Sequence, residues 1–152
     1  MAKIAPLAQF IISFDGGVIN DGPNGAIGKG VTTETLRRCY WNHWRADNIK
    51  DQSIANILVD WVCTSGTPGI AIVQAMVGVK ANGIADKRTI SAINRQEPAV
   101  LFNCIKACRK QFIESIVKSN SSQRRFYDEW LRRLEGIKYG SLIDSRGNTI
   151  TW

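Results

Sequence analysis

Three aspartates stand where a carboxyl group could take part in acid–base chemistry. Asp15 closes a predicted helix over residues 4–14, Asp21 lies in the glycine-rich segment that follows, and Asp60 lies on a predicted helix over residues 52–65. A carboxyl at a helix end beside such a segment can be partly removed from water, which raises its pKa and keeps a proton available. The alternative for Asp15 is a helix-ending residue that accepts hydrogen bonds from loop amides.

Asp60 stands out because the helix around it is apolar over most of its circumference. Such a helix is typical of the centre of a fold. We call its remaining polar positions the polar stripe, and they are Ser53, Asn56, Asp60 and Thr64. A carboxylate there must either be hydrogen-bonded or face a cleft. Asp60 is therefore a second carboxylate for chemistry or, alternatively, an anchor for a neighbouring loop.

Helical spacing of apolar residues predicts the elements that position these aspartates. Leu7, Phe10, Ile11 and Phe14 predict the first helix, and six glycines with Pro23 make residues 16–30 a loop or short hairpin. Thr32 or Thr33 can cap a second helix, which leads to the aromatic residues Tyr40, Trp41 and Trp44, and Asp51 or Ser53 can cap the central helix.

The second half of the chain is predicted as four further helices and a tail. The helices cover about residues 69–77, 87–94, 98–118 and 123–137, and Pro98 opens the longest of them. In the last helix, Phe126, Trp130, Leu131 and Leu134 are expected to face inward, and Arg124, Arg125, Arg132 and Arg133 to face water. The tail, residues 139–152, can form a small hairpin at Arg146-Gly147.

Composition is that of a folded globular protein. The chain has 152 residues, of which 44% are hydrophobic and 22% charged, and carries a formal net charge of +7. The basic charge attracts polyanions such as wall polymers and nucleic acids. Four cysteines without a CxxC pair and a single histidine argue against a metal site and favour buried free thiols. No apolar run spans a bilayer and no export signal is recognised, so we expect synthesis in the cytoplasm.

Several short segments of the chain resemble motifs of a known family. The segment Phe14-Asp15-Gly16-Gly17-Val18-Ile19-Asn20-Asp21 looks like the Glu-Gly-Gly-Tyr-Val-Asn-Asp signature of glycoside hydrolase family 108, the N-acetylmuramidases and secretion-activator-type proteins. Gly30-Val31-Thr32, Tyr40-Trp41 and Leu58-Val59-Asp60-Trp61 with Ser65-Gly66 resemble later family motifs in the same order. Residues 72–79, 82–86 and 89–93 are similar to the peptidoglycan-binding part predicted to follow.

The resemblance implies a mainly α, lysozyme-like fold with a small glycine-rich loop or hairpin. It implies a muramidase-like catalytic part at residues 1–66, a peptidoglycan-binding helical part at 67–138 packed on it, and a tail at 139–152 within one compact unit. The family cleaves the glycan strand next to N-acetylmuramic acid. The expected partner is therefore peptidoglycan, which the protein reaches after release from the cytoplasm. We expect a monomer that has no cofactor or metal, does not bind nucleic acid and does not span the membrane.

Carried onto this sequence, the family's catalytic glutamate falls on Asp15. Asp60 and Asp21 are the candidate second carboxylates, and the predicted sugar-binding residues are Asn20, Thr32, Trp41, Trp44 and Ser65. Trp41 and Trp44 are equally compatible with a place in the core. An alternative function is a catalytically silent peptidoglycan-binding or lysis-associated relative. It rests on aspartate in place of glutamate and on Ile27 in place of the loop threonine.

Overall fold

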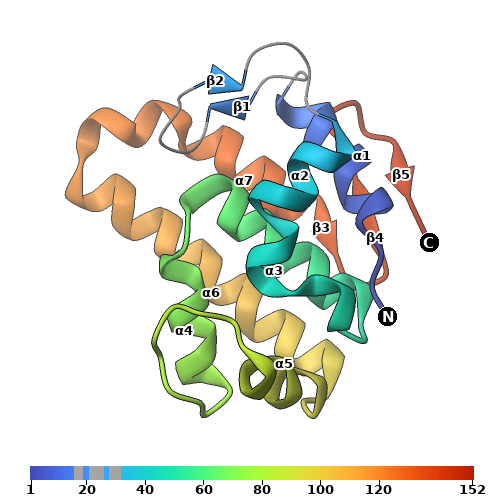
Figure 1. Cartoon of the computed structure of the whole chain (residues 1–152). Helices are drawn as coiled ribbons and strands as arrows, with labels where there is room; N and C mark the ends of the chain where they lie inside the picture. The colour runs from blue at the N-terminus through green and yellow to red at the C-terminus, as the bar shows by residue number, and fades with distance from the viewer. Residues whose placement is uncertain (16–18, 21–25, 28–31) are drawn as a thin grey trace.

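The computed structural model describes residues 1–15, 19–20, 26–27 and 32–152. Figure 1 shows a bundle of helices around a central one, with small strands at its edges. In chain order the α-helices are α1 (Ile4–Asp15), α2 (Thr33–Cys39), α3 (Gln52–Ser65), α4 (Pro68–Met76), α5 (Lys87–Asn94), α6 (Pro98–Ser119) and α7 (Tyr127–Glu135). The described residues also form the 3-10 helices η1 (Trp41–Trp44), η2 (Ala46–Asn48) and η3 (Ser121–Phe126). The prediction of a mainly α fold is confirmed.

The strands are short and all of their pairings are antiparallel. Strands β1 (Ile19–Asn20) and β2 (Ala26–Ile27) pair across the glycine-rich segment, so the predicted hairpin is present. Strands β3 (Ile137–Lys138), β4 (Ser141–Ile143) and β5 (Thr149–Ile150) form a second sheet in that order. The turn between β4 and β5 contains Gly147 at φ 85°, a left-handed conformation that glycine adopts without strain. The hairpin expected at Arg146-Gly147 is thus confirmed, whereas β3 is an addition that the sequence did not predict.

Helix α3 lies at the centre of the fold, as its apolar circumference predicts. Asp51 caps its first turn by accepting a hydrogen bond from the Ile54 amide at 2.9 Å. The helix packs against α1, α4, α6, η1 and β3, and its residues from Ser53 to Val62 are all buried. Along the polar stripe, Ser53 accepts a hydrogen bond from the Gly140 amide at 2.8 Å, which fixes the turn between β3 and β4. The stripe therefore serves to attach later elements to α3.

The last predicted helix differs from the prediction in two ways. Its first part, Ser121–Phe126, is the 3-10 helix η3, and only Tyr127–Glu135 is α-helical. The Asn120 side chain accepts a hydrogen bond from the Ser122 amide at 3.2 Å, which sets the tight first turn of η3. Arg124, Arg125 and Arg132 are exposed as expected, but Arg133 is only 9% exposed. The prediction that Arg133 faces water is wrong, because it turns inward toward α3.

A single cluster of buried side chains runs through the molecule, from Ala2 and Ile4 near one terminus to Ile150 near the other. The cluster contains residues from both of the parts predicted from the sequence. The boundary between these parts at residue 66 stays a prediction. The cysteines are free thiols, but Cys104 is exposed and the other three are only partly covered, so the prediction of buried thiols is wrong. None of the helices in the described residues is long and apolar enough to cross a membrane.

Gly136 provides a test of how tightly α7 is joined to the β3–β5 sheet. Its backbone is ordinary (φ −70°), but a Cβ atom there would lie 2.5 Å from the Ile143 carbonyl oxygen. We expect Gly136→Ala to lower the free energy of unfolding by about 1–3 kcal/mol, as overpacking does. Urea unfolding measures this. The exposed neighbour change Glu135→Ala is the control, with an expected effect within about 0.5 kcal/mol. Equal stability of the two variants would contradict this account.

Candidate functional site

The predicted aspartates Asp15 and Asp60 meet in a cluster with two arginines. We call Asp15, Asp60, Arg109 and Arg133 the Asp–Arg cluster. Asp60 is fully buried on α3, and each of its carboxylate oxygens is paired with a different arginine. Arg109 Nη2 of α6 lies 3.0 Å from Oδ2, and Arg133 Nη2 of α7 lies 2.7 Å from Oδ1, with Arg133 Nε at 3.2 Å. Asp60 thus holds α6 and α7 against α3.

Arg109 and Arg133 use their remaining donors on neighbouring groups. Arg109 Nη1 donates to the Ile57 carbonyl oxygen at 3.1 Å, and its Nη2 reaches the Thr64 hydroxyl at 3.4 Å. Arg133 Nη1 donates to Asp15 Oδ1 at 2.8 Å, so one guanidinium bridges the carboxylates of α1 and α3. Because both carboxylates bind the same planar group, Asp15 lies close enough to Asp60 for the charge of Asp60 to raise the pKa of Asp15.

The two carboxyl groups differ in their tendency to hold a proton. Burial would raise the pKa of Asp60, but the charges of Arg133 and Arg109 outweigh it and hold this pKa below its ordinary value. For Asp15 the balance is reversed. Burial is the largest effect and raises the pKa of its carboxyl; together with the charges of Asp60 and Glu129 it outweighs the lowering by Arg133. Asp15 is therefore the carboxyl of the cluster that is more suited to carry a proton.

Asp15 is also the carboxyl that retains contact with solvent. Its side chain is 22% exposed, against 0% for Asp60. Among the described residues, its only hydrogen-bond partner is Arg133, on Oδ1, so Oδ2 has no partner there. A carboxyl that an arginine holds at one oxygen has a fixed orientation, as proton delivery to a bound substrate requires.

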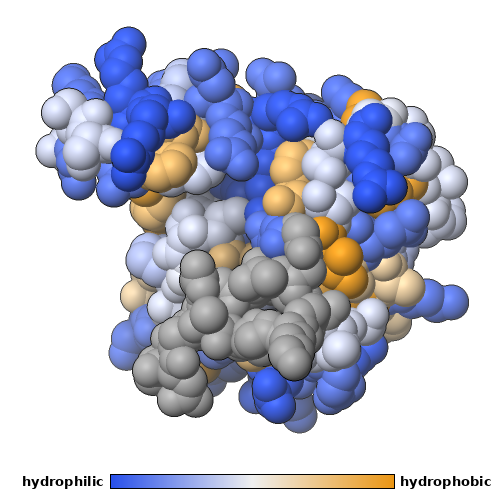
Figure 2. Space-filling model, turned by 90° about the horizontal axis from the view of Figure 1, so that it is seen from above, coloured by the Kyte–Doolittle hydropathy of each residue, from blue (hydrophilic) through white to orange (hydrophobic). Residues whose placement is uncertain are grey.

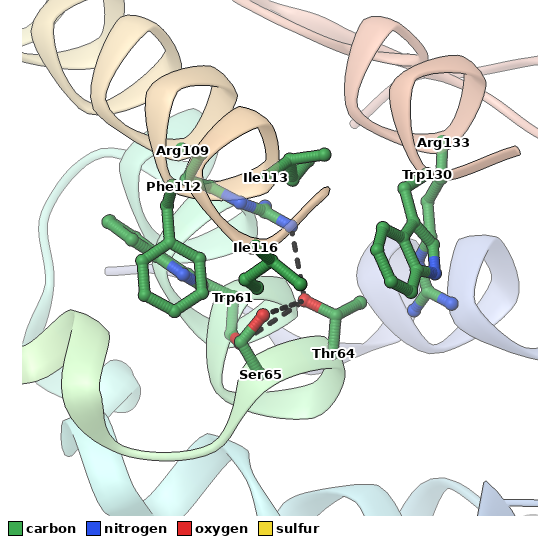
Figure 3. A pocket seen from close by; sticks show the side chains of 9 residues that line it. All are labelled: Trp61, Thr64, Ser65, Arg109, Phe112, Ile113, Ile116, Trp130 and Arg133. Carbon is green, nitrogen blue, oxygen red and sulfur yellow. Dashed lines mark hydrogen bonds between the residues drawn. The ribbon is translucent and has the colours of Figure 1, made fainter. Parts of the chain in front are cut away.

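A cavity of about 180 Å³ lies next to the cluster, between the end of α3 and the hairpin of α6 and α7. Figure 3 shows Trp61 and Phe112 on one side, Trp130 and Arg133 on the other, and Thr64 and Ser65 along one edge. Seen from above in Figure 2, the tip of this hairpin protrudes at the upper left as a largely hydrophilic lobe. The cavity offers aromatic faces, hydroxyls and two guanidinium groups, the groups that suit a sugar ring with apolar C–H faces and polar edges.

Of the other predicted site residues, Ser65 lies next to the Asp–Arg cluster, and Thr32 and Asn20 belong to other elements. Ser65 lines the cavity beside the cluster. Thr32 caps α2 by accepting a hydrogen bond from the Thr35 amide at 3.1 Å. The backbone of Asn20 pairs with Ala26 in the β1–β2 hairpin, and Asp21 lies outside the described residues.

Trp41 and Trp44 are buried. Both were expected either to bind sugar or to pack in the core, and they are 0% and 1% exposed. The Trp41 Nε1 donates to Asp47 at 2.9 Å, which fixes its ring in place. Their burial agrees with the core alternative, and we leave both out of the proposed site.

Arg109 and Arg133 are the site residues that the sequence analysis missed. Arg109 lies one helical turn from Ile105 and one from Ile113, within the apolar stripe of α6. Arg133 lies next to Leu134 and one turn from Trp130, within the stripe of α7. A charge inside an apolar stripe is the signal that could have identified both, because such a charge needs a buried partner.

Comparisons with known proteins point to the bacterial cell wall. Residues 68–135 match the family model described as "Predicted Peptidoglycan domain". Among solved structures, the chain resembles SagA from Brucella abortus, with a TM-score of 0.64 and 19% sequence identity over 88% of this chain and 91% of that one. No match was found among the curated proteins. The likeness to SagA supports the predicted lysozyme-like, mainly α fold, and the family match supports a peptidoglycan-related protein.

Asp60 provides a stability test of the cluster. We expect Asp60→Asn to lower the free energy of unfolding at pH 7 by about 3–5 kcal/mol, because the buried Arg109 loses its counter-charge and Arg133 keeps only Asp15. The lowered pKa of Asp60 means that the unfolded chain binds its proton more tightly than the folded one. Its contribution is therefore present above the unfolded pKa of about 3.9 and is lost as pH falls through the folded value.

Urea unfolding between pH 3 and pH 7 measures both effects. The gap between wild type and Asp60→Asn should narrow toward acid pH. The exposed change Asp128→Asn in α7 is the control, with an expected effect below about 1 kcal/mol. A gap that is constant with pH would show that Asp60 does not act through its charge.

Proposed function

We propose that this chain is a peptidoglycan hydrolase of the N-acetylmuramidase type, with Asp15 as general acid. The observation that carries the proposal is the state of Asp15: partly exposed at the end of α1, held by Arg133 at one oxygen, and with its pKa raised by burial. The family match over residues 68–135 supports peptidoglycan as the polymer. The resemblance of the segment around Asp15 to the family 108 signature supports cleavage of the β-1,4 glycan bond.

In this mechanism Asp15 protonates the glycosidic oxygen as the bond to the anomeric carbon breaks. The proton passes from the Asp15 carboxyl to the leaving sugar, and the carboxylate left behind accepts the Arg133 N–H bond already directed at it. Arg133 is then a positioning residue that also stabilises the ionised acid. Asp15 is restored when the attacking water gives up a proton.

The structure limits which residue can assist that water. Asp60 has both oxygens engaged by arginines and has no contact with solvent, so we do not assign it the role of base or nucleophile. Asp21 stays a prediction for that role. Thr64, Ser65 and the partly exposed Trp130 line the cavity next to Arg133 and are proposed to hold the sugar ring, whereas Trp61 is buried and forms the inner wall.

A second candidate function is a catalytically silent protein that only binds peptidoglycan. The observation in its favour is that both oxygens of Asp60 are bound by arginines, so Asp60 cannot serve as the second carboxylate. A close ion pair with Arg133 also suits a purely structural Asp15.

Dye release from labelled peptidoglycan separates the two functions. For the enzyme we expect Asp15→Asn to lower the rate at least about 100-fold, because general acid catalysis contributes roughly 10²–10⁴-fold. Asp15→Glu, which restores the family residue, should keep activity, and the exposed change Glu135→Gln is the control. If neither wild type nor Asp15→Glu releases dye while both sediment with the wall material, the silent alternative is correct.

The pH dependence of dye release tests the role of Asp15 as acid. Activity needs the protonated carboxyl, so the rate should fall as pH rises through its pKa, which lies above the ordinary 3.8. Glu129 is exposed and its charge raises the pKa of Asp15, so Glu129→Gln should move this fall to lower pH. Glu135→Gln should leave the profile in place. A profile that is unaltered in Glu129→Gln and centred near pH 3.8 would count against Asp15 as the acid.

A further inference from the structure

A second feature with binding chemistry lies on α5, away from the Asp–Arg cluster. Lys87, Ser91 and Arg95 follow one another at four-residue spacing, so they form a single exposed row along the helix. Hollows of about 460 and 540 Å³ adjoin this row, and both are lined by its three residues. In Figure 1, α5 lies at the lower end of the molecule, whereas the β1–β2 hairpin that follows Asp15 in the chain lies at the upper end.

The first hollow, which we call the basic groove, has a fixed floor. It lies between α5 and the connection from η1 to α3, which contributes Arg45, Asn48 and Lys50. The Asn94 side chain joins the two walls, because it donates to the Asn48 carbonyl oxygen at 2.9 Å and accepts from the Lys50 amide at 2.9 Å. The width of the groove is therefore set by hydrogen bonds before any ligand arrives.

Backbone strain occurs at the same place. Arg45 has φ 48° and ψ 45°, and among the described residues it is the only non-glycine with a positive φ. Such a conformation costs free energy in a residue with a Cβ atom and is found preferentially at binding and catalytic sites. Here it places the Arg45 side chain in the lining of the groove.

The lining holds four cations and no carboxylate. Arg45, Lys50, Lys87 and Arg95 are all exposed, and within the described part of the chain none of them forms a salt bridge. Of the nearby acids in the sequence, Asp47 pairs with Arg37, and Asp51, Asp86 and Glu97 cap α3, α5 and α6. The positive charge of the groove is therefore available to an anionic ligand.

We propose that the basic groove binds the carboxylates of peptidoglycan stem peptides. This rests on the proposed function, and α5 lies within the residues that match the peptidoglycan family model. Beside its cations the groove presents the Asn48 amide, the Ser91 hydroxyl and apolar Ile90. This mixture fits a short peptide with amides, small apolar side chains and free carboxylates better than a uniform phosphodiester chain.

Isothermal titration of the full chain with a disaccharide-peptide fragment of peptidoglycan tests the proposal. We expect the double variant Lys87→Gln/Arg95→Gln to bind about tenfold more weakly than wild type, as the loss of two exposed ion pairs allows. Arg124→Gln/Arg125→Gln removes the same charge from exposed positions of η3 and is the matched control, with less than a twofold effect. Raised salt should reduce the difference between the groove variant and wild type.

Three further ligands decide what the groove recognises. The same fragment with its carboxylates amidated and the disaccharide without peptide should both lose the dependence on Lys87 and Arg95. Equal affinity of the groove variant and its matched control would overturn the proposal, and so would a short single-stranded DNA that displaces the fragment from wild type at comparable concentration. Asp15→Asn should bind the fragment like wild type, so a failure of hydrolysis and a failure of this groove give different results.

Discussion

The fold depends on one buried negative charge. Asp60 lies at the centre of α3 with no exposed surface, and a carboxylate in that position is stable only with counter-charges and hydrogen bonds around it. Arg109 and Arg133 supply both, and each comes from a helix that follows later in the chain. The requirement thus fixes where α6 and α7 lie. Arg133 Nη1 also binds Asp15, so the same requirement fixes the position of the end of α1.

This arrangement gives two chemically similar side chains different roles. Asp60 is surrounded by positive charge and stays ionised, whereas Asp15 shares a single guanidinium and is raised in pKa by burial. The difference comes from the environment alone, since the two residues are of the same type. In the proposed function, aromatic and hydroxyl groups of the cavity beside Arg133 would bind the sugar, and the cations of the basic groove on α5 would bind the stem peptide.

Local signals in the sequence were enough to place most of the helices. Asp51 and Thr32 were each one of two candidate caps, and Pro98 was identified as the start of the long helix, because each acts through its own neighbours. Arg133 was misplaced because its exposure depends on a partner 73 residues away in the chain. The strand β3 was missed for a similar reason, since a two-residue strand exists only through its pairing with β4. Trp41 and Trp44 were left undecided, and their burial depends on packing against α3 that spacing alone does not specify.

Two properties of the protein, the proton affinity of Asp15 and the packing of the helices, depend on the single side chain of Arg133. It is the shared contact of the acid that we assign to chemistry and of the anion that holds the helices together. A substitution there that tuned the proton affinity of Asp15 would at the same time unbalance the charge at Asp60. The pKa of Asp15 can therefore be changed mainly by substitutions at peripheral positions. Glu129 is one of these, because its charge acts on Asp15 and its side chain lies outside the core. In relatives that have the Asp–Arg cluster, substitutions should therefore be more frequent at the residues around Arg133 than at Arg133 itself.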